Sequence, residues 1–501
     1  MDLLSFVDLP TCLVLVLTTG ILFYLYGIWP FGVWKSLGMD GPKPSPFIGN
    51  FYQLVKEGME PFIEKRSKKY GRTFGIYYGR DPMLVTTDLD ILKEVLVKNF
   101  NQFTNRFEKL EIFPEEVGSM LPFTTGAQWK RIRHILTPTF STGKLKQMEH
   151  HIQRCSTQLT KNIEEAVRKG EKIEVKRFFG AYTMDVIAGT AFGLEVNSQK
   201  DLDHPFVRNA ASAAVDLSSQ GSLLVLLAKA FPFLTPLIKF LIKNVFHPRG
   251  VKSFIGNIRH IIKERKLEGT ANRKPDLLQL ILSCESNETD RMNVLSRVEV
   301  VAQALTFFGA GYETTASTLQ FMAHSLALHP EVQEKIVCEI KEQLGDEIPT
   351  YEGVSKLKYL DGAIHETLRM YPPSIAGNRM ASEEVTIKGV TIPKGAGVMI
   401  PIGNVMKDPE YFPEPDKFIP ERFSEGSIDP ISFLAFGFGP RLCIGMRLAL
   451  LEMKMAMVHV LRRIKFMKTD DLQETLKIQT GTRLRFPDQA IVIKAVMRDN
   501  C

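Results

Sequence analysis

The stretch that most constrains this chain is residues 436–445, which read Phe-Gly-Phe-Gly-Pro-Arg-Leu-Cys-Ile-Gly. It places Cys443 in a loop of glycines and a proline, and a run of helix-forming residues follows directly. Cys443 is therefore expected at a helix N-terminus, where free backbone N–H groups and the helix dipole favour an anion such as a thiolate. Arg441 adds a nearby positive charge. A thiolate held in a tight hydrogen-bonded loop is typical of an axial ligand of haem iron.

Other readings of Cys443 explain less of the pattern. A single cysteine is usually a small buried hydrophobic residue, and a nucleophilic cysteine would need a histidine base, which no motif supplies here. A zinc or iron–sulfur site would need further cysteines at close spacing. The whole pattern Phe-x-x-Gly-x-Arg-x-Cys-x-Gly favours the haem ligand, because each fixed position has its own physical task.

Composition narrows the class of protein. The chain has 501 residues, of which 44% are hydrophobic, enough for a large core. Its net charge is +7 without any block of Lys and Arg, so a nucleic-acid partner is not expected. The six cysteines are scattered and include no Cys-x-x-Cys, which indicates a reducing compartment.

The N-terminal region predicts a membrane anchor. Residues 9–34 carry no charge, and the twenty residues 9–28 would form a helix about 30 Å long, the thickness of a bilayer core. A cleaved signal peptide explains the region less well, because no Lys or Arg precedes the apolar run and no small-residue cleavage site ends it. Asp2 and Asp8 before the span, and Lys35 and Lys43 after it, predict a luminal N-terminus and a cytosolic body. The proline-rich residues 41–46 predict a semi-rigid hinge.

Between the anchor and the cysteine loop the pattern is mostly helical. Residues 74–87 predict a short sheet with a turn at 79–82, and residues 266–275 and 285–291 predict exposed loops. Residues 223–246 are unusually apolar. They fit either ordinary core or a segment that dips into the membrane surface near the anchor, and the sequence leaves both possibilities open.

Residues 294–328 predict a long helix that is buried nearly all round, because between Glu299 and His324 it carries a single charge, Glu313. At its middle the small residues Ala310 and Gly311 precede the acid–alcohol pair Glu313 and Thr314. Glycine could serve packing, threonine could bond back to its own helix, and the acid could be a paired core charge. A buried unpaired Glu is costly, so a function or a partner must explain it.

Three further motifs supply charges that could act together. Glu366 and Arg369 lie three residues apart on a predicted helix and can meet, and the segment 420–423 offers Arg422. Earlier in the chain, Trp129 and Arg133 place an indole N–H and a guanidinium one helical turn apart. Such donors suit a carboxylate like a haem propionate.

These five motifs occur in the order and spacing of the cytochrome P-450 superfamily, which the chain resembles over essentially its whole length. The motifs Ala-Gly-Tyr-Glu-Thr-Thr and Pro-Arg-x-Cys-Ile-Gly-Met-Arg resemble those of the vertebrate family 3 type. The resemblance implies a mainly α fold with small β-sheets (α+β). We expect an anchor at residues 1–29, the hinge at 30–46 and one haem-thiolate monooxygenase domain at 47–501.

The resemblance also implies the roles of individual residues. Cys443 is the proximal ligand of haem b, Phe436 packs near its thiolate, Ala310 borders the haem, and Thr314 with Glu313 delivers protons for oxygen activation. Trp129, Arg133, Arg379 and Arg441 hold the propionates, and Glu366, Arg369 and Arg422 form a structural ion network. The candidates for the substrate cavity are Phe107, Leu121, Phe123, Phe308, Ser374, Ile375 and Leu484.

Departures from the family pattern fall in the substrate cavity. Gly309 stands where relatives often carry a large apolar residue, Pro122 replaces a common hydroxyl residue, and residues 107–125 look longer than usual. The identity of the substrate is therefore open, whereas the expected chemistry is unaffected.

The implied function is oxygen insertion into lipophilic substrates such as steroids and xenobiotics, at the endoplasmic reticulum membrane. No Rossmann-type glycine motif for flavin or nicotinamide is present, so electrons must come from NADPH through a cytochrome reductase, with cytochrome b5 as a further possible partner. Basic docking candidates are Lys130, Arg131, Lys144, Lys146 and Arg447. Two alternatives are an isomerase of lipid peroxides, disfavoured by Glu313 and Thr314, and a non-catalytic haem-binding sensor.

Overall fold

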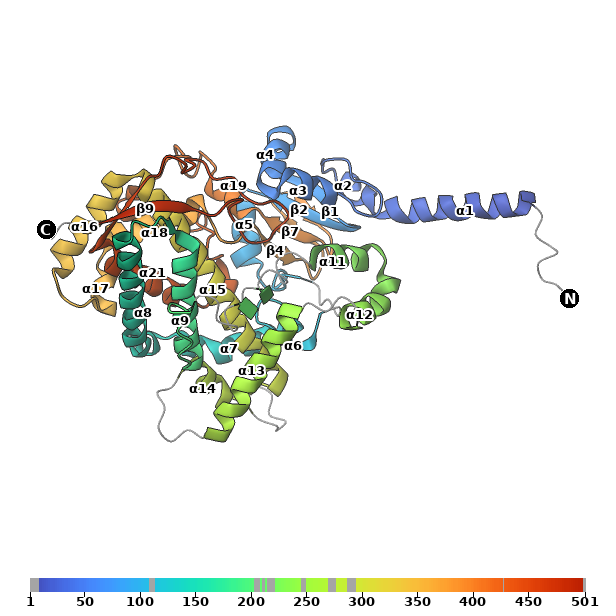
Figure 1. Ribbon diagram of the computed structural model, residues 1–501. Coiled ribbons are helices and arrows are strands. Elements are labelled where there is room, and N and C mark those ends of the chain that lie inside the picture. The colour runs from blue at the N-terminus through green and yellow to red at the C-terminus, as the bar shows by residue number, and fades with distance from the viewer. Residues whose placement is uncertain are drawn as a thin grey trace.

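The computed structural model describes residues 9–107, 113–201, 208–209, 212–213, 221–244, 249–268, 276–285, 294–426 and 428–498. Within these ranges helices dominate, and three small sheets lie among them (Figure 1). The prediction of a mainly α fold with small β-sheets is therefore confirmed.

The helix α15 (Arg297–Leu328) forms the centre of the body. It begins later than the predicted residue 294 because Ser296 caps it. The Ser296 side chain accepts a hydrogen bond from the Glu299 N–H at 3.2 Å, and the Glu299 carboxylate accepts one from the Ser296 N–H at 3.0 Å. The helix is buried on nearly all sides, as its composition predicts.

Four long helices surround or extend this core: α8 (Thr142–Arg168), α9 (Val175–Phe192), α18 (Lys358–Met370) and α21 (Met446–Leu461). Their apolar side chains join those of α15 in the largest hydrophobic cluster of the described residues. Further α-helices of the body, among the described residues, are α3 (Phe51–Glu57), α4 (Met59–Tyr70), α5 (Leu89–Lys93), α6 (Glu115–Gly118), α7 (Gly126–Leu136), α11 (Gly221–Ala230), α12 (Thr235–Asn244), α13 (Arg249–Glu268), α14 (Leu277–Leu282), α16 (Pro330–Leu344), α17 (Tyr351–Ser355), α19 (Ile402–Met406) and α20 (Glu421–Ser424). Short turns of helix are η3 (Glu94–Lys98), η4 (Thr137–Phe140), η6 (Pro232–Leu234) and η7 (Gly439–Arg441).

The largest sheet has the order β1-β2-β7-β4. Strands β1 (Thr73–Tyr78) and β2 (Asp81–Thr86) form an antiparallel hairpin, as predicted, in which Tyr78 lies opposite Asp81. The turn is shorter than predicted, since Asp81 and Pro82 already belong to β2. Parallel to β2 runs β7 (Gly397–Ile400), followed by the antiparallel β4 (Gly377–Met380). The smaller sheets contain β3 (Ile173–Glu174), β9 (Val492–Met497) and β8 (Ile464–Met467), and β5 (Val385–Ile387) with β6 (Val390–Ile392).

The helix α1 (Leu9–Ile28) projects away from the body and continues through η2 (Trp29–Gly32) and α2 (Val33–Ser36) (Figure 1). The continuous helical span Pro10–Ser36 contains a window of mean hydropathy 2.0 that is 6% buried, so it is long and apolar enough to cross a membrane. The proline-rich segment that follows runs along β1. There the Asn50 side chain donates to the carbonyl oxygens of Pro42 and Lys43, each at 3.3 Å.

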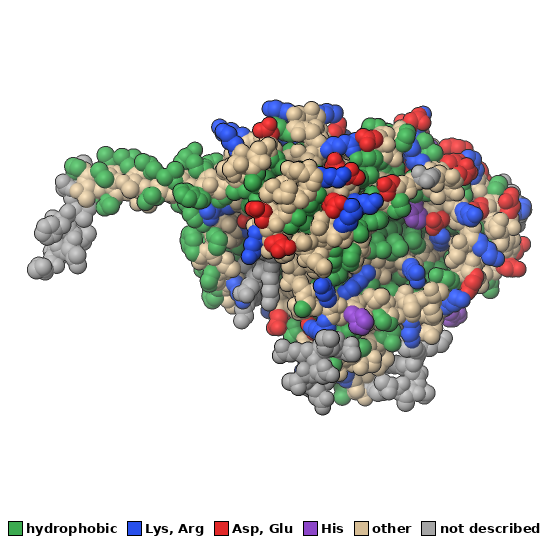
Figure 2. Space-filling model, turned by 180° about the vertical axis from the view of Figure 1, so that it is seen from behind, with side chains coloured by type: hydrophobic (Ala, Val, Ile, Leu, Met, Phe, Trp, Pro, Cys, Tyr) green, Lys and Arg blue, Asp and Glu red, His purple; other side chains and the backbone are tan. Residues whose placement is uncertain are grey.

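The apolar region 223–246, as far as it is described, forms α11, η6 and α12, which build a small hydrophobic cluster that meets the main core at Phe113. Val225, Ala228 and Ile238 are buried in this cluster. Phe233, Leu237 and Phe240 point to the exterior and are 69%, 52% and 60% exposed. Figure 2 shows hydrophobic side chains along the anchor and on the adjoining part of the body. The region therefore has both a core-like face and an exposed apolar face.

Most of the two predicted loops, 266–275 and 285–291, lies outside the described residues. At their margins, Lys266 belongs to α13, and Glu285 forms an isolated bridge with Leu295.

Candidate haem site

The cysteine loop has the predicted geometry. Cys443 lies between η7 and the start of α21, and its backbone N–H donates to the Phe436 carbonyl at 2.9 Å, which closes the loop. Gly437 and Gly439 have φ angles of +74° and +73°, which favour glycine. At Gly439 a Cβ would lie 2.2 Å from the Leu96 carbonyl oxygen, so only glycine fits this close approach.

The backbone N–H groups of Gly445 and Met446, at the N-terminus of α21, lie near the Cys443 sulfur. Burial raises the pKa of the Cys443 thiol, while these N–H groups and the guanidinium groups of Arg106 and Arg133 act in the opposite direction. A metal ion bound to the sulfur would favour the thiolate much more strongly than these donors can. The loop thus supplies the donors that a ligating thiolate needs.

A cavity of about 1010 Å³ opens over Cys443. It is at the upper end of the range for small-molecule sites. The cavity brings together residues that the sequence places more than 300 positions apart. Among the predicted haem residues, those that line it are Trp129, Arg133, Ala310, Thr314, Arg379, Phe436, Arg441 and Cys443.

Four of the arginines that line this cavity lie close to one another: Arg106, Arg133, Arg379 and Arg441. Arg441 is 3% exposed, donates to the Thr104 and Thr124 carbonyls at 3.0 and 2.9 Å, and lies 4.0 Å from the ring of Trp129. Burial, together with the charges of the other three arginines, lowers the pKa of Arg441 to about 8. Burial and Arg106 lower the pKa of Arg379 to about 9.

Among the described residues no carboxylate forms an ion pair with any of these four arginines. The Arg379 Nε is buried without a hydrogen-bond partner. Four like charges in a buried site are unfavourable unless an anion enters. Haem carries two carboxylates and needs an axial ligand, so the arginine cluster and the Cys443 sulfur together fit it.

Arg106 was not predicted from the sequence. It lies alone between Asn105 and Phe107, outside any motif, and no spacing marks it. Its guanidinium donates to the Arg441 carbonyl at 2.9 Å, so the fold brings it into the cluster.

One face of α15 borders the cavity. Thr314 lines it, and its hydroxyl donates to the Ala310 carbonyl at 2.6 Å, which leaves the oxygen lone pairs available to accept from the cavity. Ala310 and Gly311 also line it. At Gly311 a Cβ would lie 2.7 Å from the Ile187 side chain, so this glycine also permits close packing of α9.

Glu313 lies outside the cavity lining and is not an unpaired charge. Its carboxylate pairs with Lys176, at the start of α9, and accepts a hydrogen bond from the Ser317 hydroxyl at 3.1 Å. The Glu313 side chain is 8% exposed, and that of Lys176 is 26% exposed. The predicted acid is thus buried, paired and joined to the surface by a lysine that the sequence did not single out.

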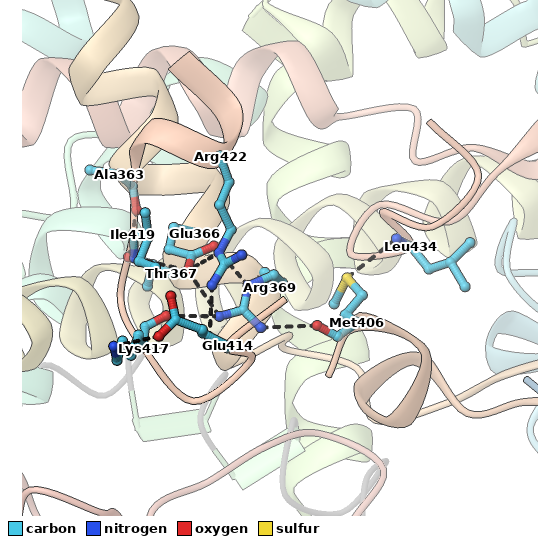
Figure 3. A network of polar contacts seen from close by, with 10 residues as sticks. All are labelled: Ala363, Glu366, Thr367, Arg369, Met406, Glu414, Lys417, Ile419, Arg422 and Leu434. Atoms are coloured by element: carbon cyan, nitrogen blue, oxygen red, sulfur yellow. Dashed lines mark hydrogen bonds and ion pairs between the residues drawn. The ribbon is translucent and has the colours of Figure 1, made fainter. Parts of the chain in front are cut away.

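The predicted ion network forms next to the site (Figure 3). The Arg369 Nε and Nη2 atoms donate to the two carboxylate oxygens of Glu366 at 2.7 and 2.9 Å, and both side chains are fully buried. Arg422 Nε donates to the same carboxylate at 3.3 Å, as does the Ile419 N–H at 3.0 Å. Arg369 also donates to the Met406 carbonyl at 3.0 Å, which ties α18 to α19.

The candidate substrate residues divide into two groups. Phe107, Leu121, Ser374, Ile375 and Leu484 line the cavity, as does Pro122. Phe123 is not among the lining residues and packs behind Phe107, with ring centroids 5.9 Å apart.

Phe308 lies on a different face of α15, with its ring centroid 4.5 Å from that of Phe192 and 5.2 Å from that of Phe254. Instead Phe307 lines the cavity, with Ala310, Gly311 and Thr314. These positions follow the i, i+3, i+4, i+7 spacing of one helix face, which could have identified Phe307 from the sequence.

Comparison with known proteins agrees with this site. A sequence model of the cytochrome P450 family matches residues 39–494. Cytochrome P450 3A29 of Sus scrofa is 40% identical over 494 residues, covering 97% of this chain and 96% of its own. Cytochrome P450 3A7 of Homo sapiens is 40% identical over 507 residues, covering 100% and 99%. The chain therefore belongs to the cytochrome P450 family and is a haem-thiolate monooxygenase of lipophilic substrates that receives electrons from NADPH through a reductase.

Proposed function

We propose that this chain oxidises steroids and xenobiotics at the endoplasmic reticulum, with its body in the cytosol and its N-terminus in the lumen. The observation that carries the proposal is the site itself: the Cys443 sulfur, near helix N-terminal N–H groups, faces a large cavity beside four arginines that pair with no acid among the described residues. The apolar helix α1 supports membrane attachment, and the charges at Asp2, Asp8, Lys35 and Lys43 support the orientation.

In this proposal each group of residues has a separate task. Cys443 ligates the iron, and Arg106, Arg133, Arg379 and Arg441 hold the two propionates. Bound haem supplies the redox chemistry, since thiolate ligation pushes electron density onto iron and favours O–O cleavage. The protein's task is to position the substrate, limit the access of water and deliver protons.

Thr314 is proposed to hold a proton-donating water in the cavity. Its hydroxyl hydrogen is already given to the Ala310 carbonyl, so Thr314 Oγ1 can accept a hydrogen bond from such a water and orient it. Glu313 is proposed as the acid that renews the protons. For this it must exchange protons with the exterior through Lys176, with which its carboxylate pairs outside the cavity lining.

The exposed apolar side chains of Phe233, Leu237 and Phe240 are proposed to rest in the membrane surface beside the anchor. Cytochrome b5 is proposed as a second electron donor. Among the docking candidates, Lys146 and Arg131 are already paired with Glu352 and Glu299, so a partner would compete with these contacts.

The isomerase alternative needs no external electrons or oxygen, and the sensor alternative needs no turnover at all. Incubation with reductase, NADPH and a panel of steroids and drugs separates the three. Oxygen-dependent product supports the monooxygenase, conversion of a lipid peroxide without NADPH supports the isomerase, and haem binding without product supports the sensor.

Replacement Cys443→Ser tests the ligand assignment. It should abolish the red-shifted Soret band of the reduced carbon monoxide complex, because that band requires a thiolate on the iron. Replacement of Cys155, which is buried between α8 and α9, serves as the matched control and should retain the band. A Cys443→Ser protein that kept the band would refute the assignment.

A further inference from the structure

An ion pair spans one end of the cavity. Lys229 on α11 pairs with Asp81, the first residue of β2, and their side chains are 16% and 33% exposed. Both residues line the cavity, together with Val225, one helical turn before Lys229, and Tyr78, which lies opposite Asp81 in the hairpin. The cavity therefore extends from Cys443 to the gap between α11 and the β1–β2 hairpin, and the ion pair bridges that gap.

The hairpin side of the gap is fixed to the end of the membrane anchor. The Trp34 indole is buried, and its N–H donates to the Ile76 carbonyl at 2.9 Å. The Arg80 guanidinium, in the hairpin turn, lies 3.7 Å from the centre of the Tyr26 ring. These contacts make the anchor end and the hairpin one unit.

The α11 side of the gap is joined to the same unit near the C-terminus of α11. The Tyr26 hydroxyl donates to the Ala230 carbonyl at 3.1 Å, and the Phe231 ring stacks on Phe47 and Phe23 with centroids 5.4 and 6.0 Å apart. Elsewhere α11 and α12 form a small apolar cluster that meets the main core at Phe113, and the buried Leu226 of α11 lies against Gly79 in the hairpin turn. In Figure 1 they lie next to the point where α1 joins the body. Movement of α11 away from the hairpin would separate Leu226 from Gly79 but would break few contacts with the main core.

The surroundings of this gap are suited to lipophilic ligands. Phe233 and Leu237, in the segment that follows α11, expose apolar surface. Since α11 and α12 lie near the body end of α1 in Figure 1, the gap is on the side of the body near the bilayer in the proposed orientation. A charged pair placed across an apolar passage is a contact that a neutral lipophilic molecule cannot replace. The pair must therefore open for such a molecule to pass.

We infer that the Asp81–Lys229 ion pair is the latch of a membrane-side entrance to the cavity and sets the rate of ligand entrance and exit. The inference rests on the proposed oxidation of lipophilic compounds. Asp81 and Lys229 take no part in the oxidation itself. With the pair formed, α11 is held against the hairpin, and with the pair open, the passage widens.

The test measures ligand arrival without turnover. The full-length holoprotein is placed in phosphatidylcholine nanodiscs and mixed with clotrimazole, a bulky lipophilic azole whose nitrogen binds haem iron and shifts its absorption. The variants are Asp81→Asn and Lys229→Gln. Each should raise both the association and the dissociation rate by about two- to fivefold, the range expected for loss of a partly exposed ion pair. The equilibrium constant should change less than either rate.

The charge-reversed double variant Asp81→Lys with Lys229→Asp restores an attractive pair and should return both rates toward those of the parent. Lys388→Gln is the matched control, because it breaks an exposed ion pair with Asp90, 3.1 Å long, outside the cavity lining, and should leave the rates unchanged. Parental rates in both single variants would overturn the latch, and so would a double variant as fast as the single ones.

Failure of the proposed function would be seen separately. Absence of any oxidised steroid or drug in the turnover panel would refute that proposal, while azole binding would still report the rates of the variants. A folding defect would be recognised by loss of the reduced carbon monoxide band, and the charge-reversed variant then distinguishes loss of the pair from loss of local packing.

Discussion

Two buried clusters of arginine in this molecule differ in one respect, the presence of an acid. Arg369 and Arg422 meet Glu366, whose carboxylate accepts from both, and the cluster is satisfied within the chain. The four arginines at the cavity have no acid among the described residues. The first cluster stabilises the fold by itself, whereas the second is complete only when an anion is bound.

This difference gives a way to distinguish buried arginines that stabilise the fold from buried arginines that bind a ligand. Burial of like charges without a counter-ion opposes folding, and it is retained where a ligand supplies the missing charge. Removal of one arginine should therefore have opposite effects on the stability of the protein in the two clusters when no haem is bound.

The largest effect is expected for Arg369→Ala. It leaves the fully buried Glu366 carboxylate with the longer bond from Arg422 and the Ile419 N–H, and a broken buried pair typically costs about 3–5 kcal/mol. We expect little folded holoprotein, measured as the reduced carbon monoxide band per unit of expressed protein. Arg422→Ala is the control in the same cluster, and its loss should be smaller because Arg422 makes a single 3.3 Å contact with the acid. A stable Arg369→Ala holoprotein that was merely slow would contradict the structural role.

The next replacement should stabilise the protein without haem and weaken the binding of haem. Arg379→Gln removes one of four like charges and its unpartnered Nε, so the protein without haem should become more stable to heat. The same change removes a charge-assisted contact to a propionate, worth about 1.5–3 kcal/mol, so haem should dissociate about tenfold faster or more. Melting of the apoprotein and transfer of haem to an acceptor protein measure the two effects.

Arg265→Gln is the matched control for this pair of measurements. Arg265 is also buried, yet it pairs with Asp276 at 2.6 Å, so its removal should destabilise the protein with or without haem. If Arg379→Gln behaved in the same way, the cavity arginines would be ordinary structural residues and the comparison would fail.

The two clusters also differ in how well the sequence predicts them. Glu366, Arg369 and Arg422 could be identified because each stands in a short motif, and the first two lie one helical turn apart. In the cavity cluster Arg133 and Arg441 stand in motifs, but Arg106 stands in none. It reaches the site because the chain segments on either side are folded against the cysteine loop and β4. A residue that reaches a site only through contacts with distant parts of the chain is not marked by any periodic pattern in the sequence.

Helix α15 shows the same limit on a smaller scale. Its length, burial and small-residue middle were predictable from composition. Composition does not determine how the helix is rotated about its axis, so Phe308 was expected in the cavity, where Phe307 lies instead. For the same reason the ion-pair partner of Glu313 could not be predicted. Lys176 lies 137 residues earlier, in a segment whose pattern shows only the start of a helix.

Helix α15 presents a hydroxyl, that of Thr314, to the cavity and holds an acid, Glu313, outside the cavity lining. Thr314→Ala should keep its haem spectrum and its ligand-induced shift, since Thr314 bonds only to its own helix. It should form less product and more hydrogen peroxide per NADPH consumed, at or below the low end of the roughly 10²–10⁴-fold typical of acid–base assistance, because water can partly replace the hydroxyl. Thr314→Ser should recover most of the coupling. Full coupling in Thr314→Ala would make this residue a packing element.

The smallest effect is expected for Lys176→Met, and it tests where the Glu313–Lys176 pair belongs in the comparison. Like Glu366, Glu313 is buried and paired, but its lysine is 26% exposed and the Ser317 hydroxyl also bonds to the Glu313 carboxylate, so loss of the pair should cost less stability than loss of Arg369. If the pair only supports the fold, as the Glu366 cluster does, product per NADPH should stay at the parental value. If Lys176 connects the buried acid to solvent, Lys176→Met should lower that ratio, as Thr314→Ala does, but by less, because Ser317 still holds the carboxylate.

Lys172→Met, which breaks an exposed pair with Asp471 at 3.2 Å, is the matched control and should change neither the product per NADPH nor the stability. A fall in coupling at unchanged melting temperature would place Glu313 with the functional charges, and a fall in melting temperature alone would place it with the structural ones.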